Sequence, residues 1–424
     1  MRCVRAAAIQ LLDTRHRNTT SRAAAIQLIK QAMAEERKEE RKKGRVAIVG
    51  CGGWSQGWHL PNLAARNDAD IVALCDREDT PGVGGCVPSL CVSMDELCDK
   101  YKAKRYKSVE ELLADDDELK LDGVLVAVPH AHHSSVGGAV LKAGKHLLME
   151  KPMSADVDDA RNLYELGTAR PNQAFLLNNT ANWQPGLIAA YEAVKSEKIG
   201  QLKHISCVFA APLGWLFEGE DHGSWNKKHG TMVGNGFAWG QFSHTFAWIF
   251  KVTGLTPQRV YCVATVSEKT GADLYDAVVV TCTNGCTINA SGVGTCPDNG
   301  CKIIGNWLFG TKGMMSYNGL AGSDNVKIDE AGGSKAADGA AASRLEIWTN
   351  DGSHEVGPPV QFEHLDQEGT GPGSLDAFVQ ACRGEEYFIG AGAVEGLKSV
   401  CTIDAMYRSA QSGKAEDVRG CDDL

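Results

Sequence analysis

The segment "HLLMEKP", residues 146–152, ends an apolar run with two charged residues, Glu150 and Lys151. A carboxylate and an ammonium at the end of a buried strand cost free energy to desolvate unless they are paired or have a chemical function. A lysine there can hydrogen-bond a substrate hydroxyl, polarise a carbonyl or transfer a proton. The structural alternative is a surface Glu–Lys pair that ends a strand, with Pro152 at the exit where no ladder bond is needed.

A glycine-rich stretch, "GCGGWS", directly follows the first apolar run, "RVAIV". Gly50 permits a tight turn, and Gly52 lets a pyrophosphate approach the backbone. A helix that begins here would point its free N–H groups at the phosphates. Ser55 stands at the third glycine position, where a small side chain still allows close packing of helix on strand. We expect this loop, with Gly53 and Trp54, to bind a dinucleotide.

An acid at the end of the next apolar run fits the same cofactor. Asp76 ends "ADIVALCD", about twenty residues beyond the loop, where a carboxylate accepts both ribose hydroxyls of an adenosine. An acid disfavours a 2′-phosphate, so NAD is predicted in preference to NADP. Arg77 keeps NADP as an alternative, because a guanidinium tolerates a phosphate.

Histidines follow the third apolar run, which ends at Val128 and Pro129. His130, His132 and His133 come next, at the strand edge where ligands bind in sheets of this kind. We expect them to contact the cofactor or to cap the next helix. A metal cluster is the alternative, but no further Cys or His lies at metal-site spacing, so no metal is predicted.

The elements that position these motifs alternate along the first part of the chain. Apolar strands separated by helices predict a parallel sheet with both faces covered, and its strands end at one common edge. The expected strands are residues 45–50, 69–76, 121–129 and 145–150, and the expected helices are 59–67, 93–102, 108–115 and 133–143.

From about residue 200 the pattern changes to successive strands with Gly and Asn turns and few helices between them. This pattern predicts a mixed or antiparallel sheet in a second, α+β domain. The predicted organisation is an N-terminal extension (1–44), a dinucleotide-binding Rossmann domain (45–170) and a domain for substrate binding and oligomerisation (171–424).

Composition excludes several classes of protein. The net charge of −10 argues against binding to nucleic acid, which needs a basic face. No apolar run reaches the roughly eighteen residues of a membrane span. The 15 cysteines include no CxxC pair and indicate free thiols in a reducing compartment. We therefore expect a cytoplasmic protein.

The first residues leave an alternative compartment open. "RAAAIQL" occurs twice, at 5–11 and 22–28, and the first 33 residues carry several arginines and a single acid, Asp13. A basic amphipathic helix of this kind is typical of a mitochondrial or plastid transit peptide. The alternative is a helical extension of a cytoplasmic protein.

Taken together, these motifs resemble the Gfo/Idh/MocA oxidoreductases, the family of glucose-fructose oxidoreductase and inositol dehydrogenase. The resemblance rests on "VAIVGCGGWS" with Asp76, "VPHAHH", "AGKHLLMEKP", "FGTKGMMSYNG" and "AMYRSAQSGK", and covers roughly residues 45–415. It implies a Rossmann domain followed by an α/β domain with a large open-faced sheet, a nicotinamide cofactor, and sugar, polyol or related hydroxy or keto substrates. It also implies a dimer or tetramer formed through the sheet face.

The resemblance assigns catalysis to Lys151, with Glu150 as its positioning partner. It also makes His244, at the end of "GNGFAWGQFSH", the proton-transfer residue. Gly240 stands where the family usually has an aspartate. Either His244 works with Lys151 alone, or another acid such as Glu220 or Asp221 reaches the site.

Substrate contacts are expected from two further stretches. Asn182 and Trp183 lie in "NNTANWQP", where the family often has an arginine, and its absence suggests that the substrate need not be anionic. Trp225 and Trp239 flank the proposed site, and indole faces pack on the C–H faces of sugar rings. The alternative is that these tryptophans pack in the core.

Three functions fit these residues. The first is an NAD(P)-dependent oxidoreductase that transfers a hydride between nicotinamide and a sugar-like hydroxy or keto compound. The second is a family member that uses NAD transiently, for elimination, epimerisation or glycoside cleavage. The third is a non-catalytic dinucleotide-sensing protein. Fold alone does not separate them.

Overall fold

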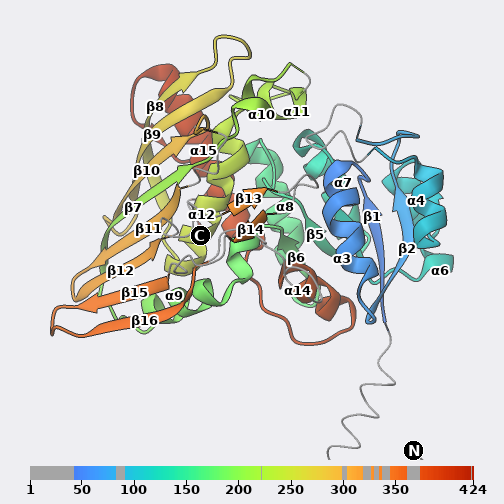
Figure 1. Ribbon diagram of the computed structural model, residues 1–424, viewed down its shortest axis with the longest axis horizontal. Coiled ribbons are helices and arrows are strands. Elements are labelled where there is room, and N and C mark those ends of the chain that lie inside the picture. The colour runs from blue at the N-terminus through green and yellow to red at the C-terminus, as the bar shows by residue number, and fades with distance from the viewer. Residues whose placement is uncertain are drawn as a thin grey trace, which may run out of the picture. The chain divides into compact units, whose positions relative to one another are not determined.

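The N-terminal part of the fold is a sheet of six parallel strands in the order β3-β2-β1-β4-β5-β6 (Figure 1). Its strands are β1 (Gly44–Val49), β2 (Ala69–Cys75), β3 (Lys104–Tyr106), β4 (Gly123–Val126), β5 (His146–Met149) and β6 (Phe175–Leu177). The order reverses between β1 and β4, so a crevice for ligands is expected at the carboxyl ends of these two strands. The sheet continues past residue 170, where the boundary of the first domain was predicted.

Helices between these strands bury both faces of the sheet. They are α3 (Leu60–Ala64), α4 (Met94–Tyr101), α5 (Val109–Ala114), α6 (Asp116–Leu119), α7 (His133–Lys142) and α8 (Val157–Thr168). Gly137 of α7 faces Leu147 and Met149 of β5, whereas Gly123 of β4 faces Phe378 of a later helix, α14 (Gly373–Cys382). Burial on two faces explains why the strands read as continuous apolar runs.

The computed structural model describes residues 43–82, 91–220, 222–297, 303–318, 326–328, 334–336, 344–360, 373–421 and 423–424. Within them, Gly44–Leu424 forms one compact unit. The predicted N-terminal extension, apart from its last two residues, lies outside the described residues. No helix of the described part is long and apolar enough to cross a bilayer.

The second sheet has nine strands in the order β16-β15-β12-β11-β7-β10-β9-β8-β17. They are β7 (Leu202–Ala210), β8 (Pro257–Val266), β9 (Asp273–Cys282), β10 (Thr287–Val293), β11 (Ile303–Gly310), β12 (Gly313–Asn318), β15 (Arg344–Thr349), β16 (His354–Pro359) and β17 (Glu416–Asp417). Only β7 and β10 pair in parallel; the other pairs are antiparallel. This confirms the predicted fold class, a Rossmann domain followed by a domain with a mixed sheet.

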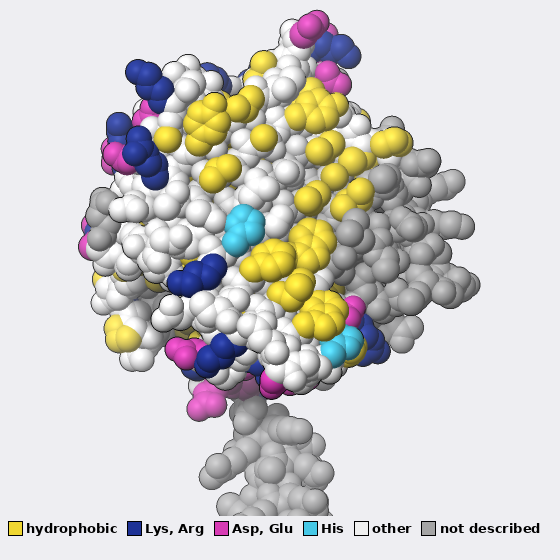
Figure 2. Space-filling model, turned by 90° about the vertical axis from the view of Figure 1, so that its left-hand side faces the viewer, with side chains coloured by type: hydrophobic (Ala, Val, Ile, Leu, Met, Phe, Trp, Pro, Cys, Tyr) yellow, Lys and Arg dark blue, Asp and Glu magenta, His cyan; other side chains and the backbone are white. Residues whose placement is uncertain are grey.

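Helices cover one face of the second sheet. They include α9 (Pro185–Lys195), α12 (Ser243–Thr253) and α15 (Ala393–Ser412), and α15 packs on β8 (Figure 1). Along β8 and β9 buried and exposed residues alternate, as expected for a sheet with one face packed on the core. Figure 2 shows hydrophobic side chains gathered on the opposite face.

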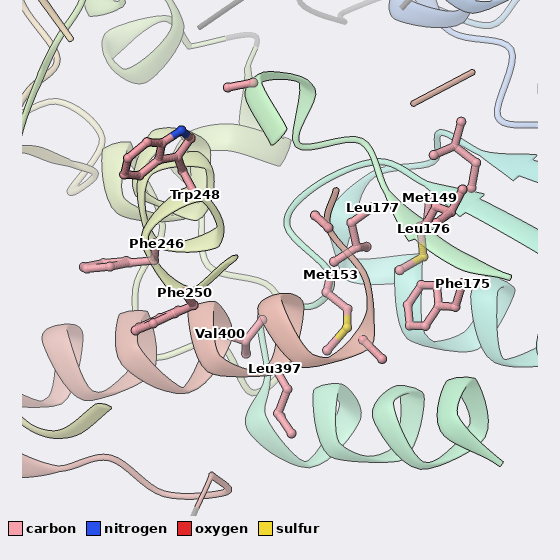
Figure 3. Packing of buried hydrophobic residues seen from close by; sticks show 14 of the residues in the cluster. Met149, Met153, Phe175, Leu176, Leu177, Phe246, Trp248, Phe250, Leu397 and Val400 are labelled. Carbon is pink, nitrogen blue, oxygen red and sulfur yellow. The ribbon is translucent and has the colours of Figure 1, made fainter. Parts of the chain in front are cut away.

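One continuous hydrophobic core joins the two sheets. Met149 and Met153, on either side of the Glu150–Pro152 segment, belong to the same cluster as Leu397 and Val400 of α15 (Figure 3). The helix α15 packs in turn on α8 and α12. This packing fixes the end of β5 relative to the start of α12, which is the geometry that a site between the two domains requires.

Candidate functional site

The glycine-rich loop has the geometry of a phosphate cradle. Gly50 has φ +91°, and a Cβ there would lie 2.4 Å from the carbonyl oxygen of Ala127, so only glycine fits. At Gly52 the nearest atom to an added Cβ is 4.0 Å away, which leaves room for a ligand at the backbone. The Ser55 hydroxyl donates to the Gly50 carbonyl over 2.5 Å and closes the turn. Helical residues begin at Gly53, earlier than the predicted residue 59.

Asp76 is held where an adenosine ribose would lie. One carboxylate oxygen accepts from the Cys51 amide (2.8 Å) and the other from the Glu78 amide (3.0 Å). Each oxygen retains a further lone pair for a ribose hydroxyl. The Arg77 guanidinium is 74% exposed and contacts Glu78 at 3.1 Å. These residues fit a dinucleotide with an unmodified ribose and so favour NAD.

The two buried histidines after β4, His133 and His130, have different surroundings. His133 is buried, with its ring nitrogens 2.6 Å from the Pro152 carbonyl and 2.9 Å from the Val128 carbonyl. It therefore ties the end of β4 to the segment after β5. Burial lowers its pKa, so one nitrogen at a time donates. We interpret His133 as a positioning residue for the segment that carries Lys151.

His130, which follows Pro129, is also buried, and its Nε2 has no hydrogen-bond partner among the residues that the structure describes. Burial, with smaller contributions from His133 and Lys151, lowers its pKa to about 3. The ring is therefore neutral at physiological pH. It packs edge-on against Trp225, with ring centroids 5.7 Å apart.

The Glu150 carboxylate collects hydrogen bonds from several elements. It accepts from Trp54 Nε1 (2.9 Å), Asn178 Nδ2 (2.7 Å) and the Lys151 amide (3.2 Å), and lies 2.9 Å from His59 Nε2. Burial alone would raise its pKa, but His59, Asn178 and Lys151 outweigh burial and lower the pKa to about 2. Glu150 is therefore ionised at neutral pH.

Sequence reasoning did not identify His59, Asn178 or Ser374 as part of this network. Asn178 directly follows β6, and the Ser374 hydroxyl donates to its side-chain oxygen at 2.6 Å. The available signal was a polar residue at the end of the sixth parallel strand. That strand is only three residues long.

Lys151 reaches across to the second domain. Its Nζ donates to the Gly240 carbonyl over 2.8 Å and lies 5.1 Å from the centre of the Trp225 ring. The Lys151–Pro152 peptide bond is cis. Glu150 contacts the lysine through the backbone N–H. The hydrogen bond of the ammonium group to Gly240 turns Lys151 toward the start of α12.

Two aromatic rings lie close to Gly240, which stands where the resemblance leads us to expect an aspartate. A Cβ on Gly240 would lie 3.1 Å from the Phe217 ring, which is a tight contact, and 3.8 Å from Trp225, which is an ordinary one. Lys151 binds the backbone carbonyl of Gly240. Gly240 lies in a π-helical segment, Ala238–Phe242, and such segments often occur at functional sites.

His244 is the second residue of α12, one helical turn beyond Gly240. The start of this helix is fixed from the Rossmann sheet, because the Asn179 side chain donates to the Ser243 carbonyl over 3.1 Å. Of the two acids considered as substitutes for the aspartate, Glu220 is exposed and Asp221 lies outside the described residues.

A buried pair of acids supports the helical segment from the other side. Asp273 accepts hydrogen bonds from the Ala238 amide (2.7 Å) and the Tyr407 hydroxyl (2.6 Å). It is also hydrogen-bonded to Asp276, and burial raises the pKa of both carboxyl groups. The two donors favour the ionised form of Asp273. We therefore place the shared proton on Asp276.

This pair predicts a specific dependence of stability on pH. The folded chain keeps a proton that the unfolded chain releases above the normal aspartate pKa. The free energy of unfolding therefore falls by about 1.4 kcal/mol per pH unit until the pH reaches the raised pKa. Asp276→Asn supplies the same hydrogen bond without a proton. In urea unfolding at pH values rising from 5, the variant should gain free energy of unfolding relative to wild type; parallel curves would contradict the assignment.

Three predicted substrate residues lie in the core instead. Asn182 is fully buried and its amide bridges the carbonyls of Ala247 and Gly390 at 3.1 and 2.9 Å. The Trp183 indole donates to the Phe388 carbonyl (3.3 Å), and that of Trp239 donates to the Gly234 carbonyl (2.9 Å). These contacts contradict a direct role in binding substrate. Of the predicted substrate residues, Trp225 lies beside Lys151 and His244 lies at the start of α12, and both stay predictions.

Two family profiles match the chain. Residues 44–177 match "Oxidoreductase family, NAD-binding Rossmann fold", and residues 187–316 match "GFO/IDH/MocA C-terminal domain". The first sheet and the second sheet therefore each correspond to a family domain, and the first is the NAD-binding one.

Individual relatives are more distant. An uncharacterized oxidoreductase of Schizosaccharomyces pombe is 30% identical over 204 residues, 47% of this chain and 49% of that protein. One of Synechocystis is 25% identical over 297 residues, 66% of this chain and 72% of that protein. The D-xylose 1-dehydrogenase (NADP(+)) of Hypocrea jecorina is 36% identical over 101 residues, 24% of this chain and 25% of that protein. The chain thus spans less than half the length of the first and third of these relatives.

Solved structures share the fold over most of the chain. The aldose-aldose oxidoreductase of Caulobacter crescentus, complexed with glycerol, has a TM-score of 0.62 and 18% identity, covering 89% of this chain and 100% of that one. The WlbA dehydrogenase of Bordetella pertussis, in complex with NADH and UDP-GlcNAcA, has the same TM-score and identity. The match covers 89% of this chain and 99% of that one. Since profiles for both domains match, the chain belongs to the Gfo/Idh/MocA family of oxidoreductases.

Proposed function

We propose that the protein is an NAD-dependent oxidoreductase that interconverts a hydroxyl and a carbonyl group on a sugar, polyol or similar neutral compound. One observation carries the proposal: the dinucleotide cradle and Lys151 lie at the same edge of the parallel sheet, and Lys151 Nζ points to the start of α12, which bears His244. The names of the Hypocrea and Caulobacter proteins support a sugar-related substrate.

Nicotinamide supplies the hydride acceptor or donor. The chain's own residues bind and orient the reacting C–O group. The Lys151 ammonium donates a hydrogen bond to the substrate oxygen, and His244 accepts or returns the hydroxyl proton. Trp225 and the neutral His130 form an apolar wall beside Lys151, which suits the C–H face of a ring.

A second candidate function follows from Gly240. Position 240 itself carries no carboxylate in this chain, where the family usually has an aspartate. Such a site would suit a reaction in which the hydride returns to the substrate, as in elimination, epimerisation or glycoside cleavage.

The stoichiometry of NADH separates the two functions. The chain is incubated with NAD⁺ and a panel of aldoses, polyols and glycosides, and NADH absorbance is compared with product formation by mass spectrometry. One NADH per product supports the oxidoreductase. Product without accumulated NADH supports transient use, and NAD⁺ binding without any product would favour a sensing protein.

We also propose that the open face of the second sheet forms a homodimer or homotetramer contact. Its exposed large hydrophobic residues are Tyr261 (44%), Val263 (54%), Val266 (53%), Tyr275 (43%), Val279 (45%) and Phe309 (36%) (Figure 2). They lie on the adjacent strands β8 and β9 and on β11. Exposed apolar side chains gathered on adjacent strands, as on β8 and β9, mark an interface.

Val279→Glu should therefore shift the protein to a smaller species. The introduced charge would be buried without a partner between two copies, at a cost of several kcal/mol. Size-exclusion chromatography with light scattering gives the mass. Val356→Glu, at an equally exposed valine on β16 (56%), is the matched control and should leave the mass unchanged. A monomeric wild type, or an unchanged mass in Val279→Glu, would contradict the proposal.

A further inference from the structure

Trp54 crosses the crevice in which a dinucleotide would lie. It lies in the first helical turn after β1, yet its indole Nε1 donates to Glu150, which follows β5. In the sheet, β4 lies between these two strands. The side chain therefore spans the carboxyl end of β4, beside the point where the strand order reverses.

The indole is fixed on one side and open on the other. Trp58 stacks on it with ring centroids 5.9 Å apart and an interplanar angle of 21°. The Nε1–Glu150 hydrogen bond of 2.9 Å fixes its rotation. Even so, Trp54 is 44% exposed, which is unusual for a tryptophan with an anchored N–H. An ordered, exposed aromatic face at a ligand crevice is a stacking surface.

The position along the crevice decides which part of the cofactor reaches it. Phosphates would lie at Gly50–Ser55, and the reacting ring must lie near Lys151. Trp54 connects these two places through Glu150, the neighbour of Lys151. The group that passes over the indole is therefore the nicotinamide half of the dinucleotide.

The charges around Trp54 favour a cation on its open face. Glu150, which accepts from the indole, is ionised and adds negative potential. Lys151, which follows Glu150 in the chain, is turned toward the Gly240 carbonyl and the Trp225 ring. His130 is neutral. Oxidised nicotinamide is a pyridinium cation, and a cation over an indole face is attracted by its quadrupole. Reduced nicotinamide is neutral and lacks this attraction.

We propose that Trp54 stacks on the nicotinamide ring and, together with Glu150, makes the site bind NAD⁺ in preference to NADH. The inference rests on the proposed function, since it assumes a nicotinamide cofactor. It assigns Trp54 a role in setting the redox state of the bound cofactor, which a phosphate-binding loop residue alone would not have.

Isothermal titration calorimetry with NAD⁺ and with NADH tests the proposal on wild type, Trp54→Phe and Trp54→Leu. We expect Trp54→Leu to weaken NAD⁺ binding about tenfold and NADH binding less than threefold, with Trp54→Phe between them. A long-wavelength absorbance shoulder from indole–pyridinium contact should appear when NAD⁺ binds wild type and be absent in Trp54→Leu. Trp348→Leu, on β15 and stacked on His354, is the control and should change neither affinity.

Different failures have different meanings. Equal weakening of both nucleotides, or no change in either, with an unchanged thermal midpoint, would overturn the role of Trp54 alone. If wild type bound neither nucleotide, the proposed function would fall and this inference with it. If Trp54→Leu did not fold, and so showed no thermal midpoint, the affinities of Trp54→Phe for NAD⁺ and NADH would decide. Phenylalanine keeps an aromatic ring but has no N–H.

Discussion

Replacing Lys151 with methionine should reduce turnover by a factor on the order of 10²–10⁴, while the Kd for NAD⁺ changes less than about threefold. Methionine has nearly the same length and is unbranched, so it fills the same space but cannot donate to a substrate oxygen. The ammonium donates to the Gly240 carbonyl over 2.8 Å, at the start of the helix that bears His244. The variant removes this donor and leaves the phosphate cradle intact.

Turnover and binding must be measured separately for this variant. Steady-state kinetics gives kcat and KM with the substrate identified from the panel, and calorimetry gives the affinity for NAD⁺. Lys142→Met, at an exposed lysine on α7, is the matched control and should behave as wild type. An unchanged kcat in Lys151→Met would refute the catalytic assignment, and a loss of NAD⁺ binding would show that the lysine serves the cofactor instead.

Replacing Glu150 with alanine should destabilise the fold by roughly 3–5 kcal/mol at neutral pH. The substitution leaves the indole N–H of Trp54, the side-chain amide of Asn178 and the buried ring of His59 without their shared acceptor. Glu150→Gln keeps an acceptor oxygen, so its free energy of unfolding should fall by less than that of Glu150→Ala. Urea unfolding followed by circular dichroism gives the free energy of unfolding for both variants.

Glu150 also predicts how the stability of the fold changes in acid. Because its pKa falls from 4.5 to about 2 on folding, the carboxylate stabilises the fold above the unfolded-state pKa. That contribution, about 3 kcal/mol for this shift, is lost as the pH falls from 4.5 toward 2. Wild type should therefore lose stability over this range more steeply than Glu150→Gln. If the two curves fell in parallel, the depressed pKa would be wrong.

Much of the Rossmann half could be predicted because local chemistry dictates it. A strand followed by Gly50 and Gly52 permits only a few backbone paths. The strand that ends at Asp76 must finish at the same edge, since parallel strands share their direction. Lys151 was placed at that edge by the same reasoning, and the structure has it there.

The second half of the site depends on contacts that no local pattern encodes. The hydrogen bond from Lys151 to Gly240 joins residues 89 positions apart and goes to a backbone carbonyl, which every residue type possesses. Trp225 and Trp239 are alike in sequence, yet only the former lies beside Lys151. The prediction that Asn182 binds substrate was wrong, because a buried amide that bridges carbonyls looks the same in sequence as one that binds a sugar.

We infer that the carboxyl edge of the six-stranded sheet holds NAD with its nicotinamide beside Lys151. The most direct test is a crystal structure of the chain with NAD⁺ bound. We predict the pyrophosphate at Gly50–Ser55, the adenosine ribose on Asp76, and the nicotinamide C4 facing Lys151 with room for one carbinol carbon between them. A dinucleotide bound elsewhere, or a nicotinamide turned away from Lys151, would contradict the account.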